Sequence, residues 1–101
     1  MMRIDAIVLH PKDNVATALK DLRPGEEALM GVLDETKRMV VTEDIPYGHK
    51  FAIRDIKMGE EILKYGEVIG RATRAILSGA HAHIQNIESL RGRGDWKRNE
   101  E

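Results

Sequence analysis

Closely spaced glycines divide the second half of this 101-residue chain into very short segments. Gly59, Gly66, Gly70 and Gly79 follow one another with only a few residues between them. Glycine weakens the interior of helices and strands but is favoured where a backbone turns sharply. Helix propensity alone would permit a helix over residues 60–65, but the recurrent glycines favour a tightly turned β structure. We therefore predict short strands joined by sharp turns.

Length and composition indicate one small domain, with residues 1–90 as the folded part and residues 91–101 as a flexible polar tail. Hydrophobic residues make up 42% of the chain and aromatic residues only 4%, so the core must be aliphatic. The net charge of -1 provides none of the basic field that nucleic-acid-binding proteins carry. No apolar run approaches the roughly 20 residues of a membrane span. Cysteine is absent, which excludes disulfides and thiolate sites. We expect a cytoplasmic protein that binds neither nucleic acid nor membrane.

Several other segments have the composition of strands. Residues 28–33 and 38–42 flank a polar turn at 34–37 and are expected to pair as a hairpin. Residues 74–78 could form one helical turn. Two turns share a Gly-Glu pair, Pro24-Gly25-Glu26 and Met58-Gly59-Glu60, but this repeat is too weak to define an architecture. Further strands are expected at residues 3–10, around 51–56 and at 81–87.

One short helix is expected over residues 13–22. Asp13 or Asn14 could cap the free N–H groups of its first turn, and Pro24-Gly25 would end it. The N-terminus of such a helix could instead bind an anion, so a substrate carboxylate could dock at Asn14. The helix would bury one apolar stripe, formed at helical spacing by Val15, Ala18, Leu19 and Leu22.

Pro46-Tyr47-Gly48 predicts a turn that presents two adjacent polar side chains, His49 and Lys50. Histidine titrates near neutrality and can transfer protons, and the lysine cation can stabilise an oxyanion. The pair could therefore act on a carboxylate substrate. The alternative is that His49 only completes the turn and that Lys50 is solvated.

His81-Ala82-His83 places two imidazoles on one face of a strand, because side chains alternate along it. Two such histidines can chelate a divalent metal, with His49 or His10 as a further ligand. The alternative is a pair of polar residues at the surface. Lys64-Tyr65-Gly66 offers a cation and a phenol before a turn, which could bind a ligand or could be ordinary turn packing.

Four blocks of the sequence, taken in order, resemble the SAF-type β-clip domain of the altronate and galactarate dehydratase family. They are residues 13–19, 48–56, 62–73 and 81–89. One position departs from the pattern: the family often ends this domain with His-x-His-Asn, and its second histidine falls at Gln85, whereas His83 and Asn86 match. The resemblance implies a mostly β single domain of the β-clip type, which together with the expected helix gives a mostly β fold with one short helix.

In this family the domain is either the N-terminal part of a long sugar-acid dehydratase or a separate small subunit. The resemblance therefore implies a lyase subunit that completes the active site for β-elimination of water from a hydroxy acid. It also implies that the chain is inactive without a large catalytic subunit. The small subunit of sulfolactate sulfo-lyase is similar and is one alternative. Another is a non-catalytic β-clip module that binds a sugar acid or a protein.

The resemblance also assigns roles to individual residues, and it implies a divalent metal, iron or manganese, held mainly by the large subunit. His81 and His83 are the candidate ligands in this chain. The implied partners are that large subunit and a sugar acid or other hydroxy acid, and a homo-oligomer stays open. We expect His49, Lys50 and His83 to lie together on one exposed rim as catalytic residues. The expected substrate-binding residues are Asn14, Lys64 and Asn86.

Overall fold

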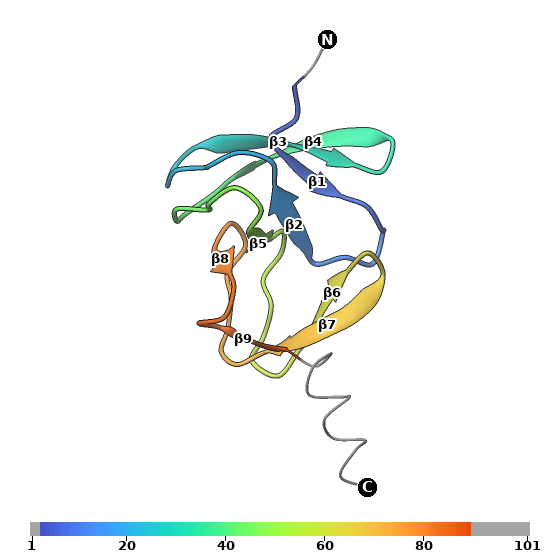
Figure 1. The fold of residues 1–101 in the computed structure, drawn as a ribbon, viewed down its shortest axis with the longest axis vertical. Helices are drawn as coiled ribbons and strands as arrows, with labels where there is room; N and C mark the ends of the chain where they lie inside the picture. Colours follow the sequence, from blue (N-terminus) through green and yellow to red (C-terminus); the bar gives the residue numbers. More distant parts are fainter. Residues whose placement is uncertain (1–2, 90–101) are drawn as a thin grey trace, which may run out of the picture.

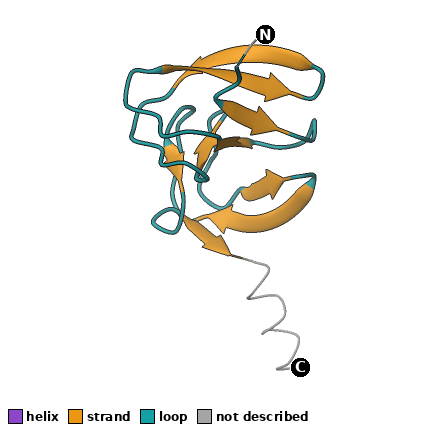
Figure 2. Ribbon diagram, turned by 45° about the horizontal axis from the view of Figure 1, so that its top comes forward, coloured by secondary structure: helices purple, strands orange, loops and turns teal. Residues whose placement is uncertain are grey.

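The described part of the chain, residues 3–89 of a computed structural model, contains strands, turns and loops and no helix (Figures 1 and 2). The predicted mostly β fold class is confirmed. The polar tail predicted at 91–101 lies outside the described residues. Within them the strands are β1 (Ala6–Val8), β2 (Val15–Ala18), β3 (Glu27–Val32), β4 (Glu35–Val40), β5 (Lys50–Ala52), β6 (Glu61–Lys64), β7 (Glu67–Ala72), β8 (His81–Ala82) and β9 (Ile87–Ser89).

The strands form two sheets. One has the order β4-β3-β1-β2-β5-β8, and the other has the order β6-β7-β9. Only β1 and β3 pair in parallel within these sheets, and every other pairing is antiparallel. In Figure 1 the smaller sheet lies below the N-terminal strands, and β8 lies to the side of β5. The pairing of β5 with β8 matters most for function, because it joins the two segments that carry histidines.

Two clusters of buried residues form the core, and β2 and β5 lie between them. Val15 and Ala52 belong to one cluster, whereas their neighbours Ala16 and Phe51 belong to the other. Alternate side chains of a strand point to opposite faces. Both faces of β2 and β5 are therefore buried, which fixes these strands firmly and holds the start of β5 in place.

The short helix predicted over 13–22 is wrong, because residues 15–18 form β2. The adjacent Val15 and Ala16 are both fully buried, whereas Leu19 is 40% exposed, which a single helical stripe would not give. A spacing of three or four positions between apolar residues can also occur by chance in a strand that is buried on both faces. The helical turn predicted at 74–78 is wrong as well, since Ile76 forms a β-bridge with Ile56.

The remaining predicted elements are close to the observed ones. The hairpin of β3 and β4 is confirmed, but its turn is tighter than the predicted residues 34–37, because strand pairing continues to Val32 and Glu35. Leu33 adopts a φ of 59° there. The strand predicted at 81–87 is divided into β8 and β9. The residues predicted not to be helical, 60–65, form β6 and its turn.

Four turns share one local design that the sequence shows only faintly. Each begins with a buried residue and has a glycine with positive φ three residues later: Leu22 with Gly25, Ile45 with Gly48, Ile56 with Gly59, and Ile76 with Gly79. The turns associate in two pairs through reciprocal backbone hydrogen bonds, Leu22 with Ile45 and Ile56 with Ile76. The Gly-Glu repeat noticed in the sequence belongs to this larger repeat of four turns.

Candidate functional site

His49 follows the second of these turns and lies directly before β5. The turn closes with a hydrogen bond of 2.9 Å from the His49 N–H to the Pro46 carbonyl. Gly48 adopts a φ of 84°, a conformation that side-chain-bearing residues rarely adopt. In two sister turns the residue equivalent to His49 is a glutamate, Glu26 or Glu60, whose carboxylate accepts the N–H at the second position of its own turn. Pro46 occupies that second position and has no N–H, so the side chain at position 49 is not needed as a cap.

Strand pairing brings this residue to two other histidines. Phe51 pairs with His81 and Lys50 pairs with Ala82 in the antiparallel register of β5 and β8. One further step in that register sets His49 opposite His83. His81 lies on the same strand face as His83, two residues away, so three imidazoles share one surface.

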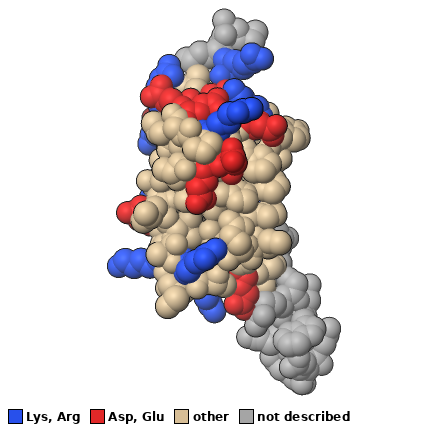
Figure 3. Space-filling view, turned by 90° about the vertical axis from the view of Figure 1, so that its left-hand side faces the viewer, with Lys and Arg blue, Asp and Glu red and all other residues tan. Residues whose placement is uncertain are grey.

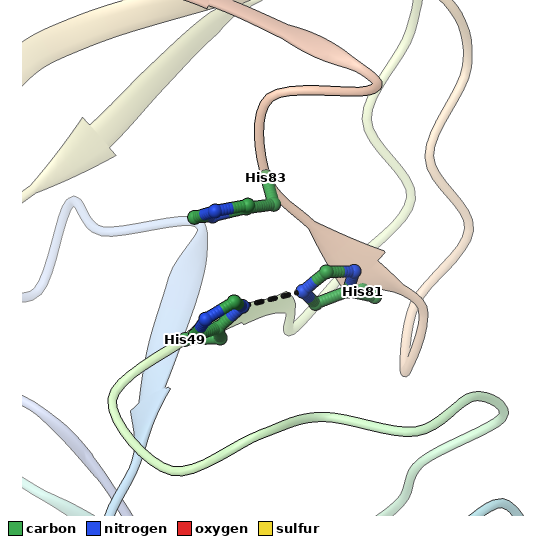
Figure 4. A group of neighbouring side chains, drawn as sticks. All are labelled: His49, His81 and His83. Atoms are coloured by element: carbon green, nitrogen blue, oxygen red, sulfur yellow. Dashed lines mark hydrogen bonds between the residues drawn. The ribbon is translucent and has the colours of Figure 1, made fainter.

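The three rings are packed against one another (Figure 4). The centroids of His49 and His83 are 4.2 Å apart and those of His49 and His81 are 5.1 Å apart, with interplanar angles of 24° and 17°. His49 Nδ1 lies 2.9 Å from His81 Nε2, so one of these nitrogens carries the proton of a hydrogen bond. One nitrogen from each ring can be chosen so that all three lie within 4.8 Å of one another. We call these three residues the histidine cluster.

Neighbouring polar groups hold the cluster in place. The Glu43 carboxylate accepts the His81 backbone N–H at 2.9 Å, and the Gln85 side-chain nitrogen lies 3.1 Å from His81 Nδ1. Asn86 is buried, and its side chain accepts the His83 N–H at 2.9 Å and donates to the His81 carbonyl at 2.8 Å. Asn86 therefore fixes the backbone of both histidines at the end of β8.

A pocket of about 360 Å³ adjoins the cluster at His83. Lys50 and Lys64 both line it, and Tyr65 and the carboxylate-bearing Glu67 contribute part of the wall, so the two cations outnumber the one anion around this small volume. Burial, followed by the charge of Lys64, lowers the pKa of Lys50. Two cations in a partly buried pocket are stabilised when an anion lies between them. The pocket thus favours a carboxylate or a similar anion.

The electrostatic environment also disfavours charge on the cluster itself. Burial is the main cause of the lowered pKa of His81 and of His83, and the neighbouring His49 and Lys50 add to it. Glu43 opposes this effect at His81 by raising its pKa. Both shifts favour the neutral form of His81 and His83, and a neutral imidazole has a nitrogen lone pair available for a proton or a metal ion.

Comparison with known families identifies the domain that carries this site. Residues 4–90 match the model of the altronate/galactarate dehydratase SAF domain. The chain belongs to this family. The resemblance noted in the sequence is thereby confirmed, and the match covers nearly all of the described residues.

Relatives of this SAF domain include both long and short proteins. The chain is 40% identical over 83 residues to altronate dehydratase of Escherichia coli (strain K12), covering 82% of this chain and 16% of that protein. It is 40% identical over 84 residues to the Bacillus subtilis (strain 168) altronate dehydratase, again covering 16% of it. It is 34% identical over 93 residues to the (2R)-sulfolactate sulfo-lyase subunit alpha of Chromohalobacter salexigens, covering 89% of this chain and 99% of that subunit. The chain thus spans about a sixth of the altronate dehydratases and nearly all of the sulfo-lyase subunit.

The structure brings together His49, Lys50 and His83, as expected, and Lys64 lines the same pocket as Lys50 and His83. It also adds His81 to them. The catalytic and substrate-binding roles themselves stay predictions. The fourth histidine of the chain, His10, lies elsewhere, with its ring against the backbone of Gly66.

Asn14 is placed differently from its expected role at a helix N-terminus. It is fully buried, and its side chain bonds to the backbone of β6 at Glu61 and Leu63. Asp13 accepts the N–H groups of Tyr65 and Gly66 in the turn that follows. The capping of a helix is therefore wrong for both residues, which instead fasten the two sheets together. Substrate contact by Asn14 stays a prediction, but the observed contacts are structural.

Sequence reasoning missed one residue beside the cluster. Glu43 lies on the segment before the turn, and only the fold shows that it reaches His81. Gln85 was noticed as the departure from the family pattern, and the structure adds that its side chain lies 3.1 Å from His81 Nδ1.

Figure 3 shows that on one face of the domain charged side chains of both signs gather toward the upper end, with few in the middle. That face presents no large patch of a single sign.

Proposed function

We propose that this SAF domain is the small subunit, or the N-terminal region, of a lyase of the altronate/galactarate dehydratase type. In this proposal the rim formed by the histidine cluster and the lysine-lined pocket completes an active site carried by a larger catalytic region. The main support is that the pairing of β5 with β8 packs His49 against His83, and that His83 lines the same pocket as Lys50. The relatives named as dehydratases and sulfo-lyase subunits support the reaction class.

The chemistry of the rim suits an acidic substrate. In β-elimination a base removes the proton α to a carboxylate, and hydroxide leaves from the neighbouring carbon with a proton from a general acid. Lys50 and Lys64 would bind the carboxylate and balance the negative charge that develops on it. Neutral imidazoles of the cluster would present lone pairs beside the reacting carbon. The divalent metal expected for this family would stabilise the enediolate when bound.

The described residues do not contain enough groups for the whole reaction. The histidine cluster is the single group of three or more potential metal-binding side chains found among residues 3–89. A lyase must abstract a carbon-bound proton, stabilise the resulting anion and protonate the leaving group, and each task needs its own group. We therefore expect no dehydratase activity from the chain alone and turnover only with the larger region.

One observation favours a second candidate. This chain covers 99% of the sulfolactate sulfo-lyase subunit alpha, which is a separate small subunit, but only 16% of altronate dehydratase. A two-subunit lyase whose substrate carries a sulfonate beside a carboxylate would therefore also suit the chain. The two lysines in the pocket could accommodate either type of anion.

Purification of the chain from its native source, together with whatever large subunit accompanies it, tests both candidates. The complex should be assayed with altronate, galactarate and (2R)-sulfolactate. His49→Ala should lower the turnover rate at least tenfold while assembly measured by analytical ultracentrifugation is retained. The matched control, His10→Ala, should leave the rate unchanged. Full turnover by His49→Ala, or turnover by the small chain alone, would refute this division of labour.

A further inference from the structure

We propose that His49, His81 and His83 form a binding site for a divalent transition-metal ion within this chain itself. The proposal assigns a specific ligand set to the SAF domain, whereas the family resemblance places the metal mainly in the large subunit. Metal binding by the chain can be measured without any lyase activity. Its failure would therefore be distinguishable from failure of the proposed function.

The first argument is the spacing of the ligands. Imidazole nitrogens bind zinc at about 2.0–2.1 Å, so two nitrogens on one tetrahedral ion lie about 3.4 Å apart. The observed separation of His49 Nδ1 and His81 Nε2 is 2.9 Å, and the three chosen nitrogens all lie within 4.8 Å of one another. The one separation is slightly shorter than required and the outer limit is longer, so small movements of the rings can reach the required value. The backbone positions are fixed by the register of β5 and β8, so only the rings need to adjust.

The adjustment is a rotation of rings that are now nearly parallel. The His49 and His83 rings are stacked at 24°, and an ion must lie in the plane of each ring that binds it. Rotation about the last side-chain torsion of histidine has a broad, shallow energy profile. Each of the three side chains is only partly buried, so this rotation displaces little of the packed core.

The second argument is the hydrogen bond that an ion would replace. His49 and His81 share one proton between two nitrogens, and a divalent ion can take its place. The Gln85 amide lies 3.1 Å from the other nitrogen of His81. With its amide turned by half a rotation, Gln85 would give up its long 3.4 Å contact with the His81 carbonyl, accept a hydrogen bond from His81 Nδ1–H and leave Nε2 free to bind the metal. Amide orientations of this kind are assigned from the hydrogen-bond network, and such outer contacts orient metal-binding histidines.

The third argument is the chemistry of the site. Three neutral nitrogen ligands with no thiolate and no carboxylate suit zinc, iron(II) or cobalt(II) rather than magnesium or calcium, which prefer oxygen. Three protein ligands also leave at least one position open, as in catalytic rather than structural metal sites. His83 belongs both to the cluster and to the wall of the anion pocket. A metal ion on the cluster would therefore lie at the edge of a pocket suited to a carboxylate.

Neighbouring charges act in both directions. Glu43 faces His81 and favours a cation there, whereas the Lys50 cation acts against one at His81 and His83. We therefore expect moderate affinity in the isolated chain and tighter binding when an anion occupies the pocket beside Lys50. Addition of a simple dicarboxylate such as malonate should strengthen metal binding by several fold.

Titration of the tag-free chain with Zn²⁺ in a calorimeter, and with Co²⁺ followed by visible absorption, tests the proposal. We expect one ion per chain and the intense bands of four- or five-coordinate cobalt. His49→Ala, His81→Ala and His83→Ala should each weaken binding at least tenfold, and Gln85→Ala should weaken it by about tenfold. The matched control, His10→Ala, should bind as the parent chain does.

Folding of each variant should be checked by thermal unfolding without metal, so that loss of binding is not confused with loss of structure. Histidine variants that fold and still bind one ion with parent affinity would overturn the proposal. Binding abolished only by His10→Ala would place the ion elsewhere and would equally overturn it. A chain that binds neither ion up to millimolar concentration, with or without malonate, would also refute it.

Discussion

The side chain of Asn14 connects the two sheets, and its removal should cost a large part of the stability of the domain. Asn14 is 0% exposed, its Oδ1 accepts the Leu63 N–H at 2.8 Å, and its Nδ2 donates to the Glu61 carbonyl at 2.9 Å. Asn14→Ala leaves both backbone groups of β6 without this partner. Each lost hydrogen bond contributes about 0.5–1.5 kcal/mol, and a buried group left unpaired costs about 1–3 kcal/mol. We expect Asn14→Ala to lower the free energy of unfolding by about 2–4 kcal/mol.

Urea unfolding followed by circular dichroism measures this loss, which should appear as a lower midpoint with an unchanged slope. The matched control is Thr17→Ala in the same strand, which should cost about 1 kcal/mol or less. A loss below about 0.5 kcal/mol for Asn14→Ala would refute the view that these bonds hold the sheets together. The predicted role of Asn14 in substrate binding is tested separately, because Asn14→Ala would then raise the KM of the complete enzyme beyond what the loss of stability explains.

Three further predictions concern backbone geometry and charge. Gly79 and Gly25 have nearly the same φ, 88° and 87°. An added Cβ would lie 2.5 Å from a backbone oxygen at Gly79 but in open space at Gly25. Thermal unfolding should therefore show that Gly79→Ala destabilises the domain far more than Gly25→Ala does. Lys50→Met should raise the denaturation midpoint, because it removes a partly buried cation near Lys64, while weakening retention of anionic substrates. A backbone hydrogen bond within its turn is the main cause of the lowered pKa of Glu26, so its stabilising contribution is present above the ordinary value of 4.5 and is lost as the pH falls through its folded pKa. The decline in urea midpoint below pH 4.5 should be smaller in Glu26→Gln.

The sequence was sufficient for the β class but not for every element. Glycine spacing correctly excluded a helix at 60–65, because sharp turns are local events that the residues themselves specify. The helix at 13–22 was wrong because β2 is covered by a different cluster on each face, so Val15 and Ala16 are both buried. A strand buried on both faces lacks the alternation that distinguishes strands from helices. Its packing partners lie far along the chain, and single-sequence patterns do not reveal them.

The candidate site was predictable to a similar extent. That His81 and His83 share a face follows from the alternation of side chains along a strand. The position of His49 beside them does not follow from any local pattern, because the hydrogen bond between His49 and His81 spans 32 residues and depends on the pairing of β5 with β8. The pocket lysines, 50 and 64, come from different sheets for the same reason. Local chemistry was visible in the sequence, and the convergence of distant segments was not.

The repeated turns show where this small domain can vary without losing its structure. Glu26 and Glu60 each cap their own turn, so changes at these positions weaken the scaffold. His49 occupies the equivalent position after Pro46, and Ala80 occupies it in the fourth turn without a side chain that could form such a cap. Ala80 instead packs against the core cluster that contains Ile56 and Ile76, so it keeps a structural role of another kind. Position 49 has neither a cap to form nor a place in a core cluster, and there the fold carries an imidazole of the candidate site.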